Sequence, residues 1–368
     1  MKILYAIQGT GNGHLARATE IVPLLREMAD TDVLVSGSQA DIKLPFSLQY
    51  QHYGISFIIG KHGGVALFKT ILKLKPVRFI RDLIQLPVHD YDLVISDFEP
   101  VSAWACRLKG KKCIGLSHQN AVLHSKAPRP SKRDLTGELI LKYYAPATVQ
   151  YGFHFKKLDD LNSTPVIRKS IKNAIPKNKK HYTVYLPSLS NREIEKTLAL
   201  FPSVKWEVFS KHNKEVYSVN NIHFYPISLE KFNHSFIHCE GILCNAGFET
   251  PAEALHMGKK LCVIPMKHQY EQACNAEFLR EMGVLVLPQI NNQNHSIENW
   301  ISSNNLIRIN YPDTIREILK RILYQTNSRD EIFFSAVKKL NYPPLKLHLT
   351  NSFERLVELR NRKTKWTH

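Results

Sequence analysis

The chain has 368 residues, of which 43% are hydrophobic and 22% charged, and its 50 Lys and Arg against 32 Asp and Glu give a formal net charge of +18. This length exceeds one average domain, and no apolar run reaches the roughly 18 residues that a membrane-spanning helix needs. The first apolar stretch runs straight into a glycine-rich loop, without the core or cleavage site of a secretory signal. We therefore expect two domains and a cytoplasmic location.

Apolar strand-like runs alternate with helix-length segments along the chain. In the first half, strands are predicted at 2–7, 32–35, 93–96 and 113–117, with a helix at 14–29. A second series of strands is predicted at 181–186, 205–209, 222–224, 242–244 and 260–264, with helices between them. Short strands separated by helices are typical of parallel α/β sheets, so we expect two doubly wound domains in tandem.

The boundary between the two domains is predicted from composition. The stretch 156–180 contains Pro165, Pro176 and eight basic residues without clear periodicity, which is typical of a linker. We expect a first domain at 1–160, a linker at 161–180, a second domain at 181–350, and a C-terminal helix within 351–368 that packs back on the first domain.

The positive charge is concentrated in the first half of the chain. Residues 1–180 hold 27 basic and 14 acidic side chains, and the stretches 61–81 and 107–133 hold six and eight basic residues with no acidic one. Such a field suits an anionic membrane surface, a nucleic acid or a phosphorylated substrate. The alternative is that the charge only provides solubility.

The cysteine content favours buried, reduced thiols. Six cysteines are too few for a disulfide framework in a chain of this length, and none forms a CxxC pair. A metal site made by His234, His238, Cys239 and Cys244 is the alternative. The stretch 241–245 reads as a buried strand, however, which would point alternate side chains apart.

A glycine-rich loop, GTGNGH at 9–14, follows the first predicted strand and opens a helix. Its glycines allow close backbone approach, and a helix N-terminus favours an anion. The third glycine of a dinucleotide-binding fingerprint is replaced by His14, so a dehydrogenase is not expected. His14 is a candidate base aimed into a cleft, the alternative being a helix cap.

A second loop, NAGFETPAEAL at 245–255, joins a predicted strand to a helix that has Pro251 near its start. Free backbone N–H groups there can take a phosphate. Glu253 falls one turn into the helix, where it either accepts from a ribose hydroxyl or is a solvated first-turn acid that complements the helix dipole. Glu249 places a carboxylate in this turn, which repels a diphosphate unless the side chain points away or pairs with a base.

A polar cluster, KHQYEQACN at 267–275, follows the next predicted strand. Open α/β sheets bind ligands at the carboxyl ends of their strands, and amide and carboxylate groups recognise sugar hydroxyls.

These three motifs, taken in order, resemble those of inverting GT-B glycosyltransferases. The helix at 247–255 and the later Glu-Gln-x-x-Asn resemble the donor half of UDP-sugar transferases and of the N-acetylglucosaminyltransferases that complete the lipid-linked peptidoglycan precursor. The loop at 9–14 and Ser-His-Gln-Asn at 117–120 resemble the latter enzymes. The resemblance covers nearly the whole chain and implies a GT-B fold, in which two Rossmann-like domains face a cleft.

The resemblance also implies roles for individual residues. His14 matches the catalytic base, Asp97 is the candidate to orient it, and Glu99 competes for that role. Nucleotide and diphosphate contacts are implied for Gly11, Gly13, Ser188, Ser190, Ile227, Asn245, Gly247, Phe248, Thr250 and Glu253, with the nucleobase near Ile227 and the ribose on Glu253. The donor sugar would contact Gln269, Glu271 and Gln272, and the acceptor-side candidates are Glu99, His118, Gln119 and Asn120.

The implied activity is transfer of a sugar from a nucleotide-sugar, first of all a UDP-sugar, to an acceptor hydroxyl with inversion. No metal or other cofactor is expected. His14 would take the proton of the acceptor hydroxyl, Asp97 would stabilise the imidazolium, and the turn at Gly247 would hold the departing diphosphate.

The acceptor is predicted from the basic first half. Stretch 65–85 interleaves Phe68, Leu72 and Phe79 with five basic residues, interrupted by Pro76, which favours an amphipathic segment on an anionic bilayer. The alternative is a helix pair with a buried stripe and a solvated basic face. We expect a lipid, lipid-linked or small-molecule acceptor, an anionic membrane surface touching 61–85 and 107–133, and a peripheral place at the inner face of the cell membrane; a soluble phosphorylated acceptor stays open.

Two other functions fit part of the sequence. A nucleic-acid-binding protein is permitted by the charge, but no recognition motif is present, and the cluster at 247–272 would have no role. No nucleic-acid partner is therefore expected. A nucleotide-sugar epimerase shares the two-domain architecture and is the nearer alternative.

Overall fold

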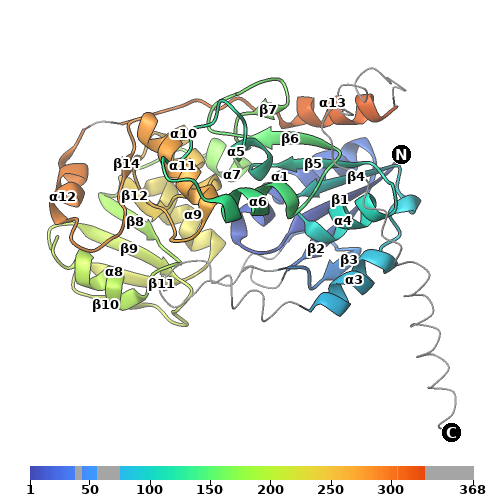
Figure 1. Ribbon diagram of the computed structural model, residues 1–368. Coiled ribbons are helices and arrows are strands. Elements are labelled where there is room, and N and C mark those ends of the chain that lie inside the picture. The colour runs from blue at the N-terminus through green and yellow to red at the C-terminus, as the bar shows by residue number, and fades with distance from the viewer. Residues whose placement is uncertain (38–43, 56–74, 305, 328–368) are drawn as a thin grey trace, which may run out of the picture. The chain divides into compact units, whose positions relative to one another are not determined.

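The computed structural model describes residues 1–37, 44–55, 75–304 and 306–327. Within these residues the chain forms two seven-stranded sheets, one from Lys2 to Ser163 and one from His181 to Val286 (Figure 1). The predicted α/β class with two doubly wound parallel-sheet units is confirmed.

The first sheet is parallel throughout and has the strand order β3-β2-β1-β4-β5-β6-β7. Its strands are β1 (Lys2–Gln8), β2 (Asp30–Ser36), β3 (Tyr50–His52), β4 (Leu93–Asp97), β5 (Cys113–Ser117), β6 (Val149–Phe153) and β7 (Asn162–Ser163). Strands β1, β4 and β5 have almost entirely buried, apolar sequences, as expected of central strands covered on both faces.

The second sheet has the order β10-β11-β9-β8-β12-β13-β14, and only the edge strand β10 runs antiparallel. Its strands are β8 (His181–Tyr185), β9 (Lys205–Ser210), β10 (Tyr217–Val219), β11 (Ile222–Pro226), β12 (Gly241–Asn245), β13 (Lys260–Ile264) and β14 (Leu285–Val286). Trp206, Phe224 and Ile242 are fully buried within it.

Helices pack on both sheets (Figure 1). In the first part of the chain they are α1 (Asn12–Met28), α3 (Pro76–Gln85), the 3₁₀ helix η1 (Val88–Asp90), α4 (Pro100–Leu108), α5 (Gln119–Val122), α6 (Leu135–Tyr143) and α7 (Lys169–Lys172). In the second part they are α8 (Asn191–Leu198), α9 (Leu229–His238), α10 (Glu249–Met257), α11 (Tyr270–Glu281), α12 (Asn294–Ser302) and α13 (Ile315–Asn327).

Several predicted helix and strand boundaries move by one or two residues. Helix α1 begins at Asn12, because Gly11 adopts the left-handed φ of +95° that ends the preceding loop. The stretch proposed as a linker contains β7 and α7. Pro76 stands at the first turn of α3, a position that tolerates its missing N–H.

Two predictions fall outside the described residues. The helix expected within 351–368 lies there, and so does the part of the amphipathic segment before residue 75. The last described helix, α13, belongs to the segment expected in the second domain, yet it packs on α1 of the first sheet. Arg316 Nη2 donates to Glu27 at 2.6 Å, and Arg321 donates to the carbonyl of Asp160 at 2.8 Å.

The cysteine prediction is confirmed, since all six thiols are buried and none is in a disulfide bond.

Along the parts of the chain that the structure covers, no helix is both long enough and apolar enough to span a bilayer.

Candidate active site

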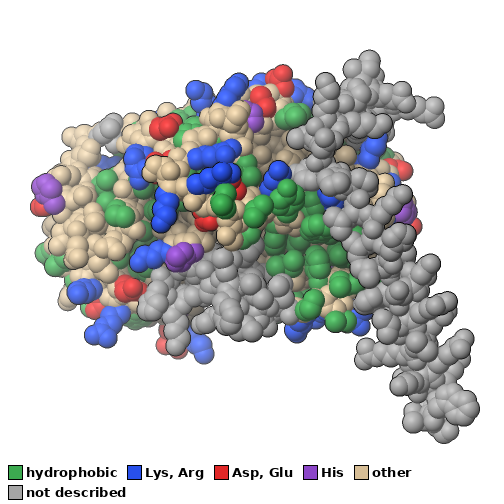
Figure 2. Space-filling view, viewed as in Figure 1, with side chains coloured by type: hydrophobic (Ala, Val, Ile, Leu, Met, Phe, Trp, Pro, Cys, Tyr) green, Lys and Arg blue, Asp and Glu red, His purple; other side chains and the backbone are tan. Residues whose placement is uncertain are grey.

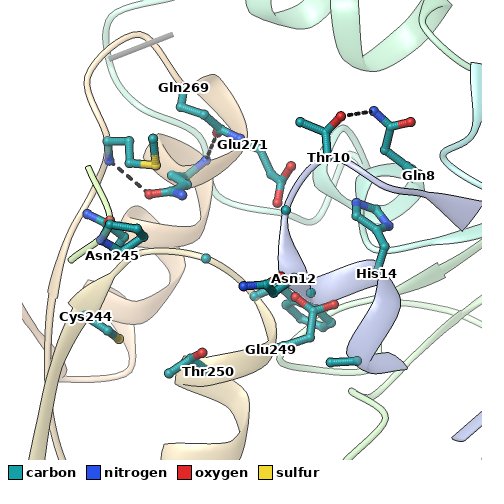
Figure 3. Close-up of a pocket in the computed structure, with 18 of the residues that line it drawn as sticks. Gln8, Thr10, Asn12, His14, Cys244, Asn245, Glu249, Thr250, Gln269 and Glu271 are labelled. Carbon is teal, nitrogen blue, oxygen red and sulfur yellow. Dashed lines mark hydrogen bonds between the residues drawn. The ribbon is translucent and has the colours of Figure 1, made fainter. Parts of the chain in front are cut away.

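The candidate site lies where each sheet reverses its winding. In the first sheet, β1 has β2 on one side and β4 on the other, and in the second, β8 lies between β9 and β12. Ligands of open α/β sheets bind at such switch points, at the carboxyl ends of the strands. The loops after β1, β12 and β13, together with α6, line a cavity of about 860 Å³ there (Figure 3).

His14 projects into this cavity from the first turn of α1 and pairs with a buried carboxylate. Its Nδ1 lies 2.8 Å from Oδ1 of Asp97, the last residue of β4, which has no exposed surface. The ring is stacked on Phe98, with 6.5 Å between ring centroids. The His14–Asp97 pair inferred from the sequence is therefore present.

Arg17, one turn further along α1, was not foreseen. It donates to Asp97 through Nε at 3.1 Å and through Nη2 at 2.6 Å, and it is only 2% exposed. Burial alone would raise the pKa of Asp97, but the charges of Arg17 and His14 outweigh burial and lower it. Asp97 is therefore a charged carboxylate facing the imidazole.

Glu99 is not a partner of His14, although the sequence placed it in competition with Asp97. Phe98 has a left-handed φ of +53°, and beyond it Glu99 turns into α4. The Glu99 carboxylate caps that helix by accepting from the N–H groups of Val101 and Ser102, and it accepts from Ser36 Oγ at 2.5 Å. Burial raises the pKa of Glu99, partly offset by these hydrogen bonds.

Glu249, whose negative charge is expected to repel a diphosphate, forms an ion pair with Arg17. The pair joins the first turn of α10 to α1. Gly13 makes room for it, because a Cβ on Gly13 would stand 2.9 Å from Cδ of Glu249. In Figure 3 the α1 loop with Asn12 and His14 faces the start of α10 with Glu249 and Thr250.

The N-terminal turn of α10 opens into the cavity. Gly247, Phe248 and Thr250 line it, and a Cβ added to Gly247 would meet nothing within 4 Å, so a ligand can approach the backbone closely. Asn245 also lines the cavity and accepts from Ser188 Oγ at 3.1 Å. Gly11 and Ile227 line it as well.

Ser190, which the resemblance implies as a nucleotide contact, does not line the cavity, and neither does Ser188. The Ser190 hydroxyl accepts from the backbone N–H of Glu193, and the Glu193 carboxylate reaches back, which makes a capping box at the start of α8. The Ser-x-x-Glu spacing is the signal for this role.

Glu253 lines the cavity but is already paired. Its two oxygens accept from Nε and Nη2 of Arg168 at 2.7 Å each, and its side chain is 3% exposed. The solvated alternative for Glu253 is thus wrong. Arg168, which stands in the expected linker, is a second cationic residue that sequence reasoning missed.

The polar cluster after β13, at 267–275, also lines the cavity. Gln269 caps α11 by accepting from the N–H of Gln272, whose own oxygen accepts from the N–H of Met266 at 2.9 Å. Glu271 accepts from Gln119 Nε2 at 2.9 Å, and the same Nε2 lies 3.3 Å from His14 Nε2. The predicted sugar contacts Gln269, Glu271 and Gln272 line the cavity, together with Gln119.

Three of the four acceptor-side candidates, Glu99, His118 and Asn120, do not line the cavity. His118 is 1% exposed, stacks on Phe248 with centroids 3.8 Å apart, and lies 2.8 Å from Asn275 Oδ1. Burial lowers the pKa of His118. Asn120 donates to the carbonyl of Tyr151 at 3.0 Å. Both side chains bind neighbouring elements, His118 to α11 and Asn120 to β6.

Acidic pairs of the Asp-x-Asp type occur at 30–32 and 90–92. The first pair opens β2 and the second directly precedes β4, so both lie at the amino ends of these strands, away from the cavity. There the Lys2 side chain pairs with Asp32, and the Lys2 backbone N–H donates to Asp92. Among the residues for which side chains are described, no group of three or more His, Cys, Asp or Glu could hold a metal ion, which includes His234, His238, Cys239 and Cys244.

Two parallel-sheet units with their switch points at a shared cavity are the architecture of the GT-B class. Three solved structures of this class illustrate the likeness. A Polygonum tinctorium UDP-glucosyltransferase capable of glucosylating indoxyl is 14% identical, with a TM-score of 0.55 over 92% of this chain and 97% of that one. Phytolacca americana UGT2, complexed with UDP-2fluoro-glucose, is 13% identical, with a TM-score of 0.50 over 92% of this chain and 93% of that one. Acinetobacter baumannii MurG is 14% identical, with a TM-score of 0.48 over 92% of this chain and 99% of that one.

The chain belongs to glycosyl transferase family 1, whose sequence pattern matches residues 1–304. No curated protein sequence matches it significantly. The comparisons give no support to the epimerase or to the nucleic-acid-binding alternative.

Proposed function

We propose that this glycosyltransferase moves a sugar from a UDP-sugar to a hydroxyl of a lipid or lipid-linked acceptor, with inversion and without a metal. The observation that carries the proposal is the His14–Asp97 pair, 2.8 Å apart, across the cavity from the open N-terminus of α10. One wall offers a base and the other a site for a leaving anion.

His14 acts as the general base in this proposal. With Nδ1 bound to Asp97, Nε2 takes the proton of the acceptor hydroxyl while the hydroxyl oxygen attacks the anomeric carbon. The bond from that carbon to the diphosphate oxygen breaks in the same step, so the configuration inverts. Asp97 compensates the charge of the imidazolium that forms.

The departing diphosphate is held by the start of α10. The backbone N–H groups around Gly247, the Thr250 hydroxyl and the helix dipole stabilise its charge, which is the task a metal ion would otherwise perform. Pairing with Arg17 removes most of the repulsion that Glu249 would exert.

The nucleoside half of the donor is assigned to the second sheet. Ile227 contacts the nucleobase in the proposal, and Glu253 accepts from the ribose. Its oxygens can do so while bound to Arg168, because each carboxylate oxygen has two acceptor sites. A UDP donor is supported by the two plant structures, one named a UDP-glucosyltransferase and the other bound to UDP-2fluoro-glucose.

The acceptor is assigned from α6, which lines the cavity with Ile140 and Leu141. Its other face exposes Leu135, Leu139 and Tyr143 by 40 to 58%. Helix α3 likewise exposes Val77, Ile80 and Ile84 beside Arg78 and Arg81. Figure 2 shows apolar side chains gathered in the region between these helices. Exposed apolar residues flanked by basic ones favour an anionic lipid surface that presents the acceptor.

Calorimetric titration with UDP, GDP, ADP and dTDP tests the donor assignment. Saturable binding of one nucleotide that is weakened in Glu253→Ala supports it, and failure of all four to bind contradicts it. His14→Ala should lower the rate of sugar transfer by about 10²-fold or more, since that is the typical effect of losing a general base. A rate within about threefold of wild type would remove His14 from the mechanism.

A further inference from the structure

The ion pair between Arg17 and Glu249 joins the base-bearing helix α1 to the donor-side helix α10. Arg17 is almost fully buried and holds Asp97 with two nitrogens, while its third nitrogen, Nη1, reaches Glu249. A guanidinium is therefore shared by two carboxylates, only one of which touches His14.

The charges around His14 can be counted element by element. Its Nδ1 faces Asp97 of β4 at 2.8 Å and Nη2 of Arg17 at 3.1 Å, and its Nε2 faces the amide of Gln119, which in turn donates to Glu271. Phe98 contributes no charge. Apart from Glu271, which is separated from the ring by Gln119, the groups that decide the local charge are Arg17, Asp97 and Glu249.

Without Glu249, the guanidinium of Arg17 would neutralise Asp97. An imidazolium at His14 would then add an uncompensated positive charge beside the buried Arg17. With Glu249 paired to Arg17, one negative charge is left over while His14 is neutral, and protonation of His14 brings the group to zero.

We propose that Glu249 is a positioning residue that acts through Arg17 to keep the charge of Asp97 available to His14 during proton transfer. This inference rests on the proposed function only in taking His14 as the base. It assigns to a side chain in the donor-binding turn an effect on the opposite wall of the cavity.

The experiment compares Glu249→Gln with wild type by NMR titration of histidine side chains in the full chain, with the His14 signal assigned through His14→Ala. The titration midpoint of His14 is expected to fall by about one pH unit, the lower end of the effect of a nearby charge. Glu27→Gln is the matched control, because it removes a carboxylate from α1 that pairs with Arg316 at the surface, and no shift is expected.

Two further measurements separate this effect from a merely structural one. The acid limb of kcat/KM against pH should move to lower pH by the same amount, and the plateau rate should fall about threefold or more because a weaker base abstracts the proton more slowly. UDP affinity measured by calorimetry should not fall. A folded Glu249→Gln protein with an unchanged His14 titration overturns the proposal.

Gly13→Ala provides a second route if Glu249→Gln does not fold. The added Cβ displaces the Glu249 carboxylate without removing its charge, and a smaller downward shift of the His14 titration is expected; its absence overturns the proposal too. Because the titration needs no substrate, a shift in Glu249→Gln combined with full transfer activity in His14→Ala would refute the proposed function while leaving the coupling intact.

Discussion

Replacing Asp97 with asparagine should destabilise the folded protein by about 3 kcal/mol at pH 7, because breaking a buried ion pair typically costs about that much or more. Asp97 is fully buried and accepts from His14, from two nitrogens of Arg17 and from Tyr5 at 3.3 Å. Asparagine keeps the shape and loses the charge. Arg17 retains Glu249 as a counter-ion, which places the cost at the lower end of the range.

The pH dependence of this destabilisation has a definite sign. The pKa of Asp97 in the folded protein lies below its ordinary value, since the charges of Arg17 and His14 outweigh the effect of burial. A lowered carboxyl pKa contributes stability above the pKa of the unfolded chain, which is about 3.9, and loses it as the pH falls toward the folded value. The gap between wild type and Asp97→Asn should be full at pH 7 and 5 and should narrow below about pH 4.

Urea unfolding followed by tryptophan fluorescence measures the gap. With a dependence on urea of about 3 kcal/mol per molar, a loss of about 3 kcal/mol lowers the unfolding midpoint by about 1 M. Asp160→Asn is the control, because its carboxylate is 89% exposed and pairs with the exposed Lys157. Equal stability of Asp97→Asn and wild type at pH 7, or a gap that stays constant at acid pH, would refute the reasoning.

Three other variants test other parts of the site. Arg168→Met leaves the buried Glu253 without its counter-ion and should cost about 3 kcal/mol in urea unfolding; an unchanged midpoint would show that the pair contributes nothing. Glu99→Gln weakens the cap of α4 and should cost about 1 kcal/mol, with the pH profile of kcat/KM unchanged; a displaced profile would return Glu99 to the environment of the base. Changing Leu135 and Leu139 together to serine should lower binding to phosphatidylglycerol vesicles about tenfold or more in sedimentation assays, with UDP affinity unchanged; undiminished vesicle binding would contradict a lipid-facing α6.

The residues at strand ends were the ones that sequence reasoning placed well. His14, Asp97 and Asn245 follow or end buried strands, and parallel strands bring their carboxyl ends to one edge, so pattern alone brings such side chains together. The short strands β3, β7, β10 and β14 were not predicted, because two or three partly exposed residues carry no clear alternation. The five-residue strand β6 was missed as well.

The cationic partners could not be read in the same way. Arginines on helices are ordinarily solvated, so nothing in the sequence marks Arg17 as buried. Its carboxylate partners Asp97 and Glu249 are 80 and 232 residues away in the sequence. Arg168 is 85 residues from Glu253 and lies in a stretch that reads as a linker. Glu99 was misjudged for a related reason. The left-handed turn at Phe98, which separates it from Asp97, leaves no mark in the composition of this segment.

The return of α13 to the first sheet has a practical consequence for recombining these enzymes. The chain passes between the halves twice, once before β8 and again before α13, where Thr314 hydrogen-bonds with Ser163. The half that carries His14 is therefore discontinuous in sequence. A chimaera that exchanges the donor half for that of another transferase needs two junctions, one between β7 and β8 and one before Ile315, so that α13 stays with its own α1. A single junction after residue 163 would place a foreign helix against Glu27 and Asp160.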